Sequence, residues 1–282
     1  MWAPDRRQNL FCRSWQMQLG RLALMRTILV LILTALLLTA SSSAGSARSR
    51  EVVAASEILA KIEMGEAVSI DNLIVEGDLN LSEIGLDVAP TLGTETALGE
   101  GVGIDLPALT SQVRIIPAQI SITNSEIRGD VRFDKTVFSG PVNFAGTDIA
   151  GNASFAESEF ESQAAFLYTS FKGNASFKDA QFNGRVYFSG DQFRGIANFE
   201  GVEFRELAGF SYAKFADDAD FKGAKFRDEA CFGGAEFRDD ADFGGTEFEG
   251  YAYFGRAWFS ERARLEDARF FEIANFYSAH LD

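Results

Sequence analysis

The dominant pattern in this chain is the return of phenylalanine at alternating steps of five and six residues. The stretch ADFKGAKFRDEACFGGAEFRDDADFGGTEF, residues 219–248, shows it clearly. An amphipathic helix needs apolar residues at i, i+3, i+4 and i+7, and a half-buried strand needs them at every second position. Neither fits, so the fixed repeat predicts a solenoid whose units pack only against their neighbours. Steps of five and six from residue 133 to residue 281 give 28 positions, of which 25 are Phe and the others are Ile149, Leu265 and Leu281.

The charged residues predict 22 residues in each turn of this solenoid. One unit of 11 residues spans a loop only about 36 Å around, which is too short to hold phenylalanine rings from opposite walls. With two units per turn, residues 22 apart stack at about 4.8 Å, where opposite charges are favourable. At period 11 like charges become adjacent, whereas at period 22 positive and negative charges alternate. The two rows that show this are Glu203, Lys225, Glu247 and Arg269, and Lys178, Glu200 and Lys222 followed by Gly244 and Glu266.

The units ADFKGAKF, ADFGGTEF and ANFEGVEF resemble pentapeptide repeats, in a phenylalanine-centred variant with one extra residue in every second repeat. The resemblance covers residues 116–282. It implies an all-β fold, namely a right-handed, four-sided β-helix. It implies no catalytic motif, because the repeats of this family are structural and function has to be argued from a site.

The first 44 residues have the composition of a targeting segment. Five arginines precede the apolar run ILVLILTALLLTA, residues 28–40, and small residues follow up to Ala44. This order predicts a secretory signal and an exported, extracellular or cell-envelope protein. The apolar run is short for a membrane span of about 20 residues. An uncleaved segment that anchors the protein in a membrane is the alternative, and Met25 is a second candidate for the true start.

Residues 45–69 are expected to form a linker and a capping helix. The helix is predicted over residues 51–65, EVVAASEILAKIEMG, and it would cover the open end of the solenoid. The repeat is expected over residues 70–282, with a Gly-, Thr- and Pro-rich loop inserted at about 87–115. The apolar side of the helix is Val52, Val53, Ile58, Leu59 and Ile62, with Gly65 as its stop, and the early repeat positions are Ile70, Val75, Leu81 and Leu86.

The exported chain is strongly acidic. The full sequence has a formal net charge of −15, and without residues 1–44 it keeps 21 basic and 40 acidic residues, a net charge of −19. Such a surface repels nucleic acid and anionic lipid, so no direct nucleic-acid binding is expected. Cys12 would leave with the signal, so Cys231 would be the remaining cysteine, pointing outward beside an inward Phe. No disulfide framework is expected.

Enzymatic activity is not expected from this sequence. It has no G-x-S-x-G, P-loop, H-E-x-x-H or C-x-x-C motif. Its one histidine, His280, lies two residues from the end and lacks evident catalytic partners. No cofactor is expected, apart from weak Ca²⁺ binding where aspartates recur 22 residues apart, because oxygen ligands suit this ion. These aspartates are Asp217, Asp218, Asp220, Asp239, Asp240 and Asp242; a solvated acidic corner is the alternative.

Two apolar surfaces are candidates for protein contacts. Five tyrosines flank a wall that is poor in charge, as interface cores often are; covering a neighbouring bare glycine is the alternative role for some of them. The last turn exposes phenylalanine rings and unpaired backbone, which favours end-to-end pairing of two molecules; the alternatives are folding of the final residues over this end, or a longer chain. The tyrosines are Tyr168, Tyr187, Tyr212, Tyr253 and Tyr277, and the end residues are Phe270, Phe271, Phe276 and Leu281.

The sequence therefore predicts a non-catalytic exported scaffold with a structural or protein-binding role at the cell surface. Its partner is not apparent from the sequence. The resemblance to a family that includes acidic rods mimicking DNA gives a second hypothesis, binding to a nucleic-acid enzyme. A third is an accessory or sensor domain of a membrane system, held through an uncleaved N-terminal segment.

Overall fold

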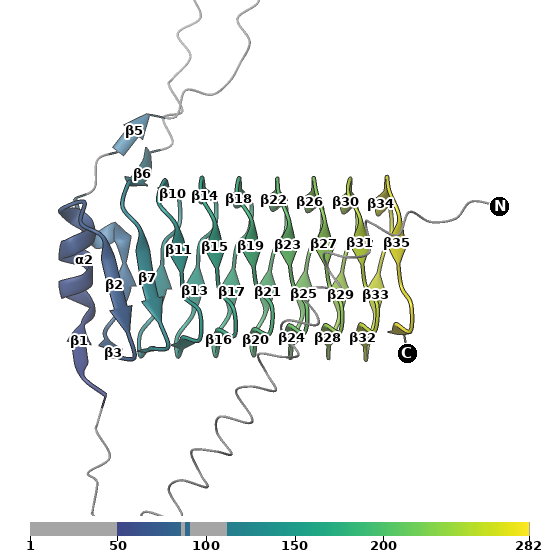
Figure 1. The fold of residues 1–282 in the computed structure, drawn as a ribbon, viewed down its shortest axis with the longest axis horizontal. Helices are drawn as coiled ribbons and strands as arrows, with labels where there is room; N and C mark the ends of the chain where they lie inside the picture. The colour runs from purple at the N-terminus through teal and green to yellow at the C-terminus, as the bar shows by residue number, and fades with distance from the viewer. Residues whose placement is uncertain (1–49, 86–87, 91–111, 282) are drawn as a thin grey trace, which may run out of the picture.

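The chain folds into a four-walled parallel β-solenoid of about nine turns, with one short helix at its N-terminal side. The computed structural model describes residues 50–85, 88–90 and 112–281. Successive turns stack along the long axis of the rod, with helix α2 at one end and the last strands at the other (Figure 1). Within the described residues, no helix is long and apolar enough to cross a membrane. The predicted targeting segment, 1–44, lies outside the described residues.

Each turn contributes one short strand to each of four walls, which we number in the order in which the chain visits them from β2 onward. Wall 1 contains β2 (Val68–Asp71), β7 (Ile120–Thr123), β11 (Val142–Asn143), β15 (Ala164–Ala165), β19 (Val186–Tyr187), β23 (Ala208–Gly209), β27 (Ala230–Cys231), β31 (Ala252–Tyr253) and β35 (Ala274–Asn275). Wall 2 contains β1 (Val52–Ala54), β3 (Ile74–Glu76), β8 (Glu126–Ile127), β12 (Asp148–Ile149), β16 (Ser170–Phe171), β20 (Gln192–Phe193), β24 (Lys214–Phe215), β28 (Glu236–Phe237), β32 (Trp258–Phe259) and β36 (His280–Leu281).

The other two walls complete the turn. Wall 3 contains β4 (Leu79–Asn80), β9 (Val131–Arg132), β13 (Ala153–Ser154), β17 (Ala175–Ser176), β21 (Ala197–Asn198), β25 (Ala219–Asp220), β29 (Ala241–Asp242) and β33 (Ala263–Arg264). Wall 4 contains β5 (Val88–Pro90), β6 (Gln112–Ile116), β10 (Thr136–Phe138), β14 (Glu159–Phe160), β18 (Gln181–Phe182), β22 (Glu203–Phe204), β26 (Lys225–Phe226), β30 (Glu247–Phe248) and β34 (Arg269–Phe270).

The register between turns confirms the predicted period of 22. Lys225 pairs with Glu203 on one side and with Glu247 on the other. The predicted charge ladders form ion pairs, since the Lys178 Nζ lies 2.8 Å from a carboxylate oxygen of Glu200. Glu203 itself receives the guanidinium of Arg227, at 3.1 Å, rather than the ammonium of Lys225.

The interior is filled by columns of phenylalanine rings. Rings one turn apart on the same wall lie nearly parallel, as for Phe199 and Phe221, whose centroids are 4.8 Å apart at an interplanar angle of 3°. Rings from walls 1 and 3 meet edge to face across the centre, as for Phe199 and Phe210 at 5.3 Å and 90°. Both are favourable geometries for aromatic pairs, worth about 0.5–1.5 kcal/mol each beyond the burial of their surface.

The five-residue step between phenylalanines contains a tight turn. The Ala224 N–H donates to the carbonyl oxygen of Phe221 at 3.0 Å, and Gly223 between them has a φ of +66°. The same place in other turns holds non-glycine residues at positive φ, among them Tyr168 and Asp179. A positive φ is rare for residues with a Cβ, so this turn sets the corner geometry of the repeat.

The N-terminal end is capped as predicted, but by a shorter helix. Helix α2 (Ala55–Glu63) buries Ile58, Leu59 and Ile62 against the first turn, and Gly65 follows it at a φ of +71°. The prediction that the helix includes Val52 and Val53 is wrong. These residues form β1, which pairs in parallel with β3, because the open wall edge satisfies their backbone groups.

Two paired strands flank the inserted segment. β5 pairs antiparallel with β6, with Val88 opposite Arg114. These strands occupy both ends of the stretch predicted as a loop at about 87–115, and residues 91–111 lie outside the described residues. A short 3-10 helix, Leu81–Glu83, precedes this segment and buries Leu81. The repeat then continues through Ile116, Ile122 and Ile127, all buried.

Candidate binding surfaces

The predicted acidic corner lies between walls 2 and 3 and divides into two groups. Asp217, Asp218 and Asp239 bring carboxylate oxygens within 4.8 Å of one another. Asp240 instead receives the guanidinium of Arg264 at 3.1 Å, and Arg264 also reaches Asp242 at 3.5 Å. The six aspartates therefore do not form one ligand set.

Two of these aspartates bond to the backbone of the corner. An Asp217 carboxylate oxygen accepts from the Asp218 N–H at 2.9 Å, and Asp239 accepts from the Asp240 N–H at 3.0 Å. Desolvation raises the pKa of Asp218, and the negative charges of Asp239 and Asp217 raise it further. Three carboxylates at this spacing offer the hard oxygen donors that Ca²⁺ takes, but their bonds to the backbone already give two of them a structural role.

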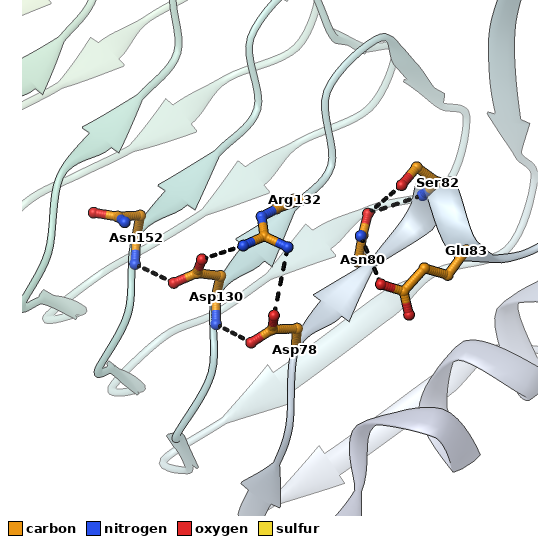
Figure 2. Close-up of polar contacts among 7 residues, drawn as sticks. All are labelled: Asp78, Asn80, Ser82, Glu83, Asp130, Arg132 and Asn152. Atoms are coloured by element: carbon orange, nitrogen blue, oxygen red, sulfur yellow. Dashed lines mark hydrogen bonds and ion pairs between the residues drawn. The ribbon is translucent and has the colours of Figure 1, made fainter.

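Nearer the N-terminus, the same corner is held by a row of side chains that sequence reasoning missed. Asp130 N–H donates to the Asp78 carboxylate, and Asn152 N–H donates to the Asp130 carboxylate, both at 2.9 Å (Figure 2). Arg132 bridges the two carboxylates at 3.4 and 2.5 Å. We call Asp78, Asp130, Asn152 and Asn174 the Asx ladder, because each accepts from the backbone one turn further along.

The Asx ladder explains why aspartates gather later at this corner. Asn174 accepts from the Ile196 N–H at 3.1 Å, and the apolar Ile196 cannot accept in turn. In the next turn Asp217 supplies the missing acceptor to Asp218, its own neighbour in sequence. The signal available in the sequence was in the neighbouring column, one residue earlier, which at period 22 changes from Gly195 to Asp217.

The five tyrosines proposed as an interaction face have different environments. Tyr212 lies over Gly234, where an added Cβ would come within 2.8 Å of the ring, and Tyr168 lies over Gly190 in the same way. Tyr187 and Tyr253 are buried, whereas Tyr277 is 68% exposed. Tyr168 and Tyr212 thus cover bare glycines, which was the alternative role suggested by the sequence.

Cys231 and His280 both lie in side-chain clusters. Cys231 is on wall 1 and packs with Tyr251 and Tyr253 in a small buried cluster on the outside of the core. The expectation of no disulfide framework depends also on Cys12, which lies outside the described residues. The His280 ring stacks on Trp258 with centroids 3.9 Å apart.

The last turn exposes several large apolar side chains. Phe271 is 62% exposed, Ile273 53% and Leu281 59%. Phe270 and Phe276 are partly buried, because each stacks on the phenylalanine one turn before it. The four residues proposed for end-to-end contact therefore lie together at one end, two packed on the core and two exposed.

A buried carboxyl group at the corner between walls 1 and 2 was missed by sequence reasoning. Asp191 is fully buried, and its Oδ1 accepts from the Thr169 N–H at 2.9 Å. Its Oδ2 is buried without a hydrogen-bond partner. Desolvation raises the pKa of Asp191 well above its ordinary value, despite opposing backbone hydrogen bonds from Thr169 and Tyr168. The signal available in the sequence was an aspartate in a column that otherwise holds only serine, threonine and alanine, from Ser125 to Ala279.

Comparison with known proteins identifies the repeat. A family profile described as pentapeptide repeats (9 copies) matches residues 122–169, 166–213, 210–258 and 232–280, which together span more than half of the chain. Comparisons with curated proteins and with solved structures gave no match.

Proposed function

Because the chain belongs to the pentapeptide-repeat family, we propose that it is a non-catalytic exported scaffold that binds protein partners through its outer walls. The observation that carries this proposal is the filling of the interior. Inward residues such as Phe199, Phe210 and Phe221 are fully buried in continuous ring stacks. A ligand therefore meets the outside of the rod, where each wall presents short, regularly spaced rows of side chains, as repeat proteins do in binding.

Export is part of the same proposal and depends on residues 1–44. Their arginines, apolar run and small residues support a signal that directs the chain out of the cytosol. If the segment is retained, the protein is an accessory or sensor domain attached to a membrane. N-terminal sequencing of the protein recovered from cells distinguishes a cleaved signal from an anchor.

A DNA-mimic role is the alternative, supported by the excess of acidic residues and by the family. Export argues against it, because a nucleic-acid enzyme would lie in another compartment. The test is to assay the purified protein for inhibition of a type II topoisomerase and, in parallel, for saturable capture of a protein from the cell-envelope fraction. The scaffold proposal expects capture without inhibition. Inhibition at stoichiometric concentrations, with no envelope partner, would favour the alternative.

A further inference from the structure

One of the four walls carries an excess of positive charge, although the whole chain is acidic. On wall 2, Lys172, Arg194, Lys214 and Arg238 point outward from four consecutive turns. The carboxylates that pair with them are Asp148, which receives Lys172 at 3.4 Å, and Glu236, which receives Lys214 at 3.1 Å and Arg238 at 3.3 Å. Arg194 makes no ion pair within the part of the chain that the structure describes. Two carboxylates thus face four cations.

Three of these cations, Arg194, Lys214 and Arg238, line a hollow in the wall. Ala216 lies between Arg194 and Arg238, one turn from each, so the two guanidinium groups stand on backbone about 10 Å apart. The short side chain of Ala216 leaves a space of about 470 Å³ between them. It is lined by Gln192, Phe193, Arg194, Lys214, Ala216 and Arg238.

The hollow is separate from the acidic corner, because the neighbouring aspartate side chains turn away from it. Asp217 and Asp239 follow Ala216 and Arg238 in sequence, but they turn into the corner and accept backbone N–H groups there. An anionic group in the hollow would therefore lie toward Lys214 and the Gln192 amide. Arginine suits this position, because its planar fork donates two parallel hydrogen bonds to a carboxylate.

We propose that this row of wall 2 is a docking site for an acidic, extended peptide segment of a partner protein, with one of its carboxylates in the hollow over Ala216. The proposal deepens the scaffold function and rests on it. The positive row extends over four turns, about 14 Å at the strand spacing, which is longer than a single small anion and fits a chain of carboxylates. Charge complementarity also selects the partner, because a basic segment would be drawn to the acidic remainder of the rod instead.

The test uses a fluorescent hexaglutamate peptide and the purified protein at low ionic strength, where exposed charges are least screened. We expect saturable binding that Arg194→Gln weakens by up to about fivefold, the size expected for one exposed charge pair. The matched control is Arg205→Gln on wall 4, half a turn further along the chain, which removes the same charge from the residue that follows Phe204 as Arg194 follows Phe193. This control should bind as the wild type does.

Several results would overturn the proposal. Equal weakening by Arg194→Gln and Arg205→Gln would mean that net charge alone matters. Displacement of hexaglutamate by submillimolar inorganic phosphate would indicate a single-ion site rather than a peptide row. A loss of hexalysine affinity in Arg194→Gln would also contradict it, because this basic peptide is drawn to the acidic surface and not to wall 2. If the envelope partner is still captured by Arg194→Gln, Lys214→Gln protein, the scaffold role stands and wall 2 is excluded as the docking site. If wall 2 binds hexaglutamate but the wild-type protein captures no envelope partner, the peptide site stands and the scaffold role fails.

Discussion

The Oδ1 of Asp191 accepts the backbone N–H of Thr169, one turn earlier at the buried corner between walls 1 and 2. Thr147 and Thr169 fill the same place in the two preceding turns, and their hydroxyls also donate to a carbonyl oxygen 25 residues earlier, as Thr169 does to Phe144 at 2.8 Å. Asp191 can match that second bond only as a protonated acid. The side chains adjacent to it in the stack, Thr169 and Ala213, are neutral, and the ammonium of nearby Lys214 pairs with Glu236.

Asp191 therefore makes stability depend on pH. Burial raises its pKa in the folded state, so between about pH 4, the ordinary value, and the raised value the folded protein holds a proton that the unfolded chain has lost. The free energy of unfolding should fall as pH rises through this range, by up to about 1.4 kcal/mol per pH unit, and then level off. Asp191→Asn should remove this component, as measured by urea unfolding from pH 4 to 9.

A second substitution at this position separates protonation from packing. Asp191→Thr restores the residue type found at 147 and 169, and at pH 7 it should stabilise the protein by about 1–3 kcal/mol, because no buried polar atom remains unpaired. Glu161→Gln, on the exposed surface of wall 4, is the control for loss of a negative charge. A pH profile unchanged by both Asp191 substitutions would show that this carboxyl is ionised or solvated in the folded protein.

The 22-residue register predicts a large difference between an inward and an outward substitution in the same turn. Lys225→Glu puts three acidic residues in a row with Glu203 and Glu247, and should cost about 0.2–1 kcal/mol for each new like-charge pair. Phe221→Ala removes a fully buried ring from its stack and should cost about 3–5 kcal/mol. Thermal and denaturant unfolding measure both. Similar losses from the two substitutions would contradict the assignment of inside and outside.

The repeat was predictable because one residue type marks every inward position. Phe144, Phe166 and Phe188 are 22 residues apart, and nothing but a closed turn of that length brings them into one stack. The start of the helix was not predictable from its apolar pattern, since Val52 and Val53 satisfy a helix face as well as they satisfy a strand. Their pairing with β3 depends on a wall edge that exists only after the chain has made a full turn. Asp191 was not predicted to be buried for a related reason. A single aspartate is expected to be solvent-exposed unless it is compared with the small, buried residues 22 positions before and after it.

The covering of glycines by tyrosines predicts coupled substitutions. Gly234→Ala should destabilise, because φ is +66° there and the new Cβ would lie 2.8 Å from the Tyr212 ring. Tyr212→Ala removes the clash but not the backbone strain, so the double variant should be more stable than the sum of the single effects by about 0.5–3 kcal/mol. Additive effects in denaturant unfolding would mean that the ring moves aside at no cost. Gly223→Ala has a similar φ with nothing within 4 Å, and serves as the strain-only control.

At the acidic corner, removing a negative charge should stabilise the protein. Asp218→Asn should raise the melting temperature slightly in the absence of metal, because it relieves repulsion from Asp239 and Asp217; one like-charge pair is worth about 0.2–1 kcal/mol. If Ca²⁺ binds weakly among Asp217, Asp218 and Asp239, its addition should stabilise the wild type more than this variant. Asp242→Asn is the comparison, because Asp242 already pairs with Arg264. An identical Ca²⁺ response in all three proteins would show that no specific site exists at this corner.

The exposed apolar side chains of the last turn predict self-association. Phe271, Ile273 and Leu281 are each more than half exposed, beside the partly buried Phe270 and Phe276. A two-fold contact between two such ends would bury both apolar surfaces and pair strand edges that otherwise invite further strands. Light scattering should therefore give a dimer, and Phe271→Asp with Leu281→Asp should give a monomer. Ile196→Asp, at an exposed apolar residue in the middle of the rod, should leave the dimer intact. A wild-type monomer at high concentration, or a dimer that persists in Phe271→Asp, Leu281→Asp protein, would contradict this contact.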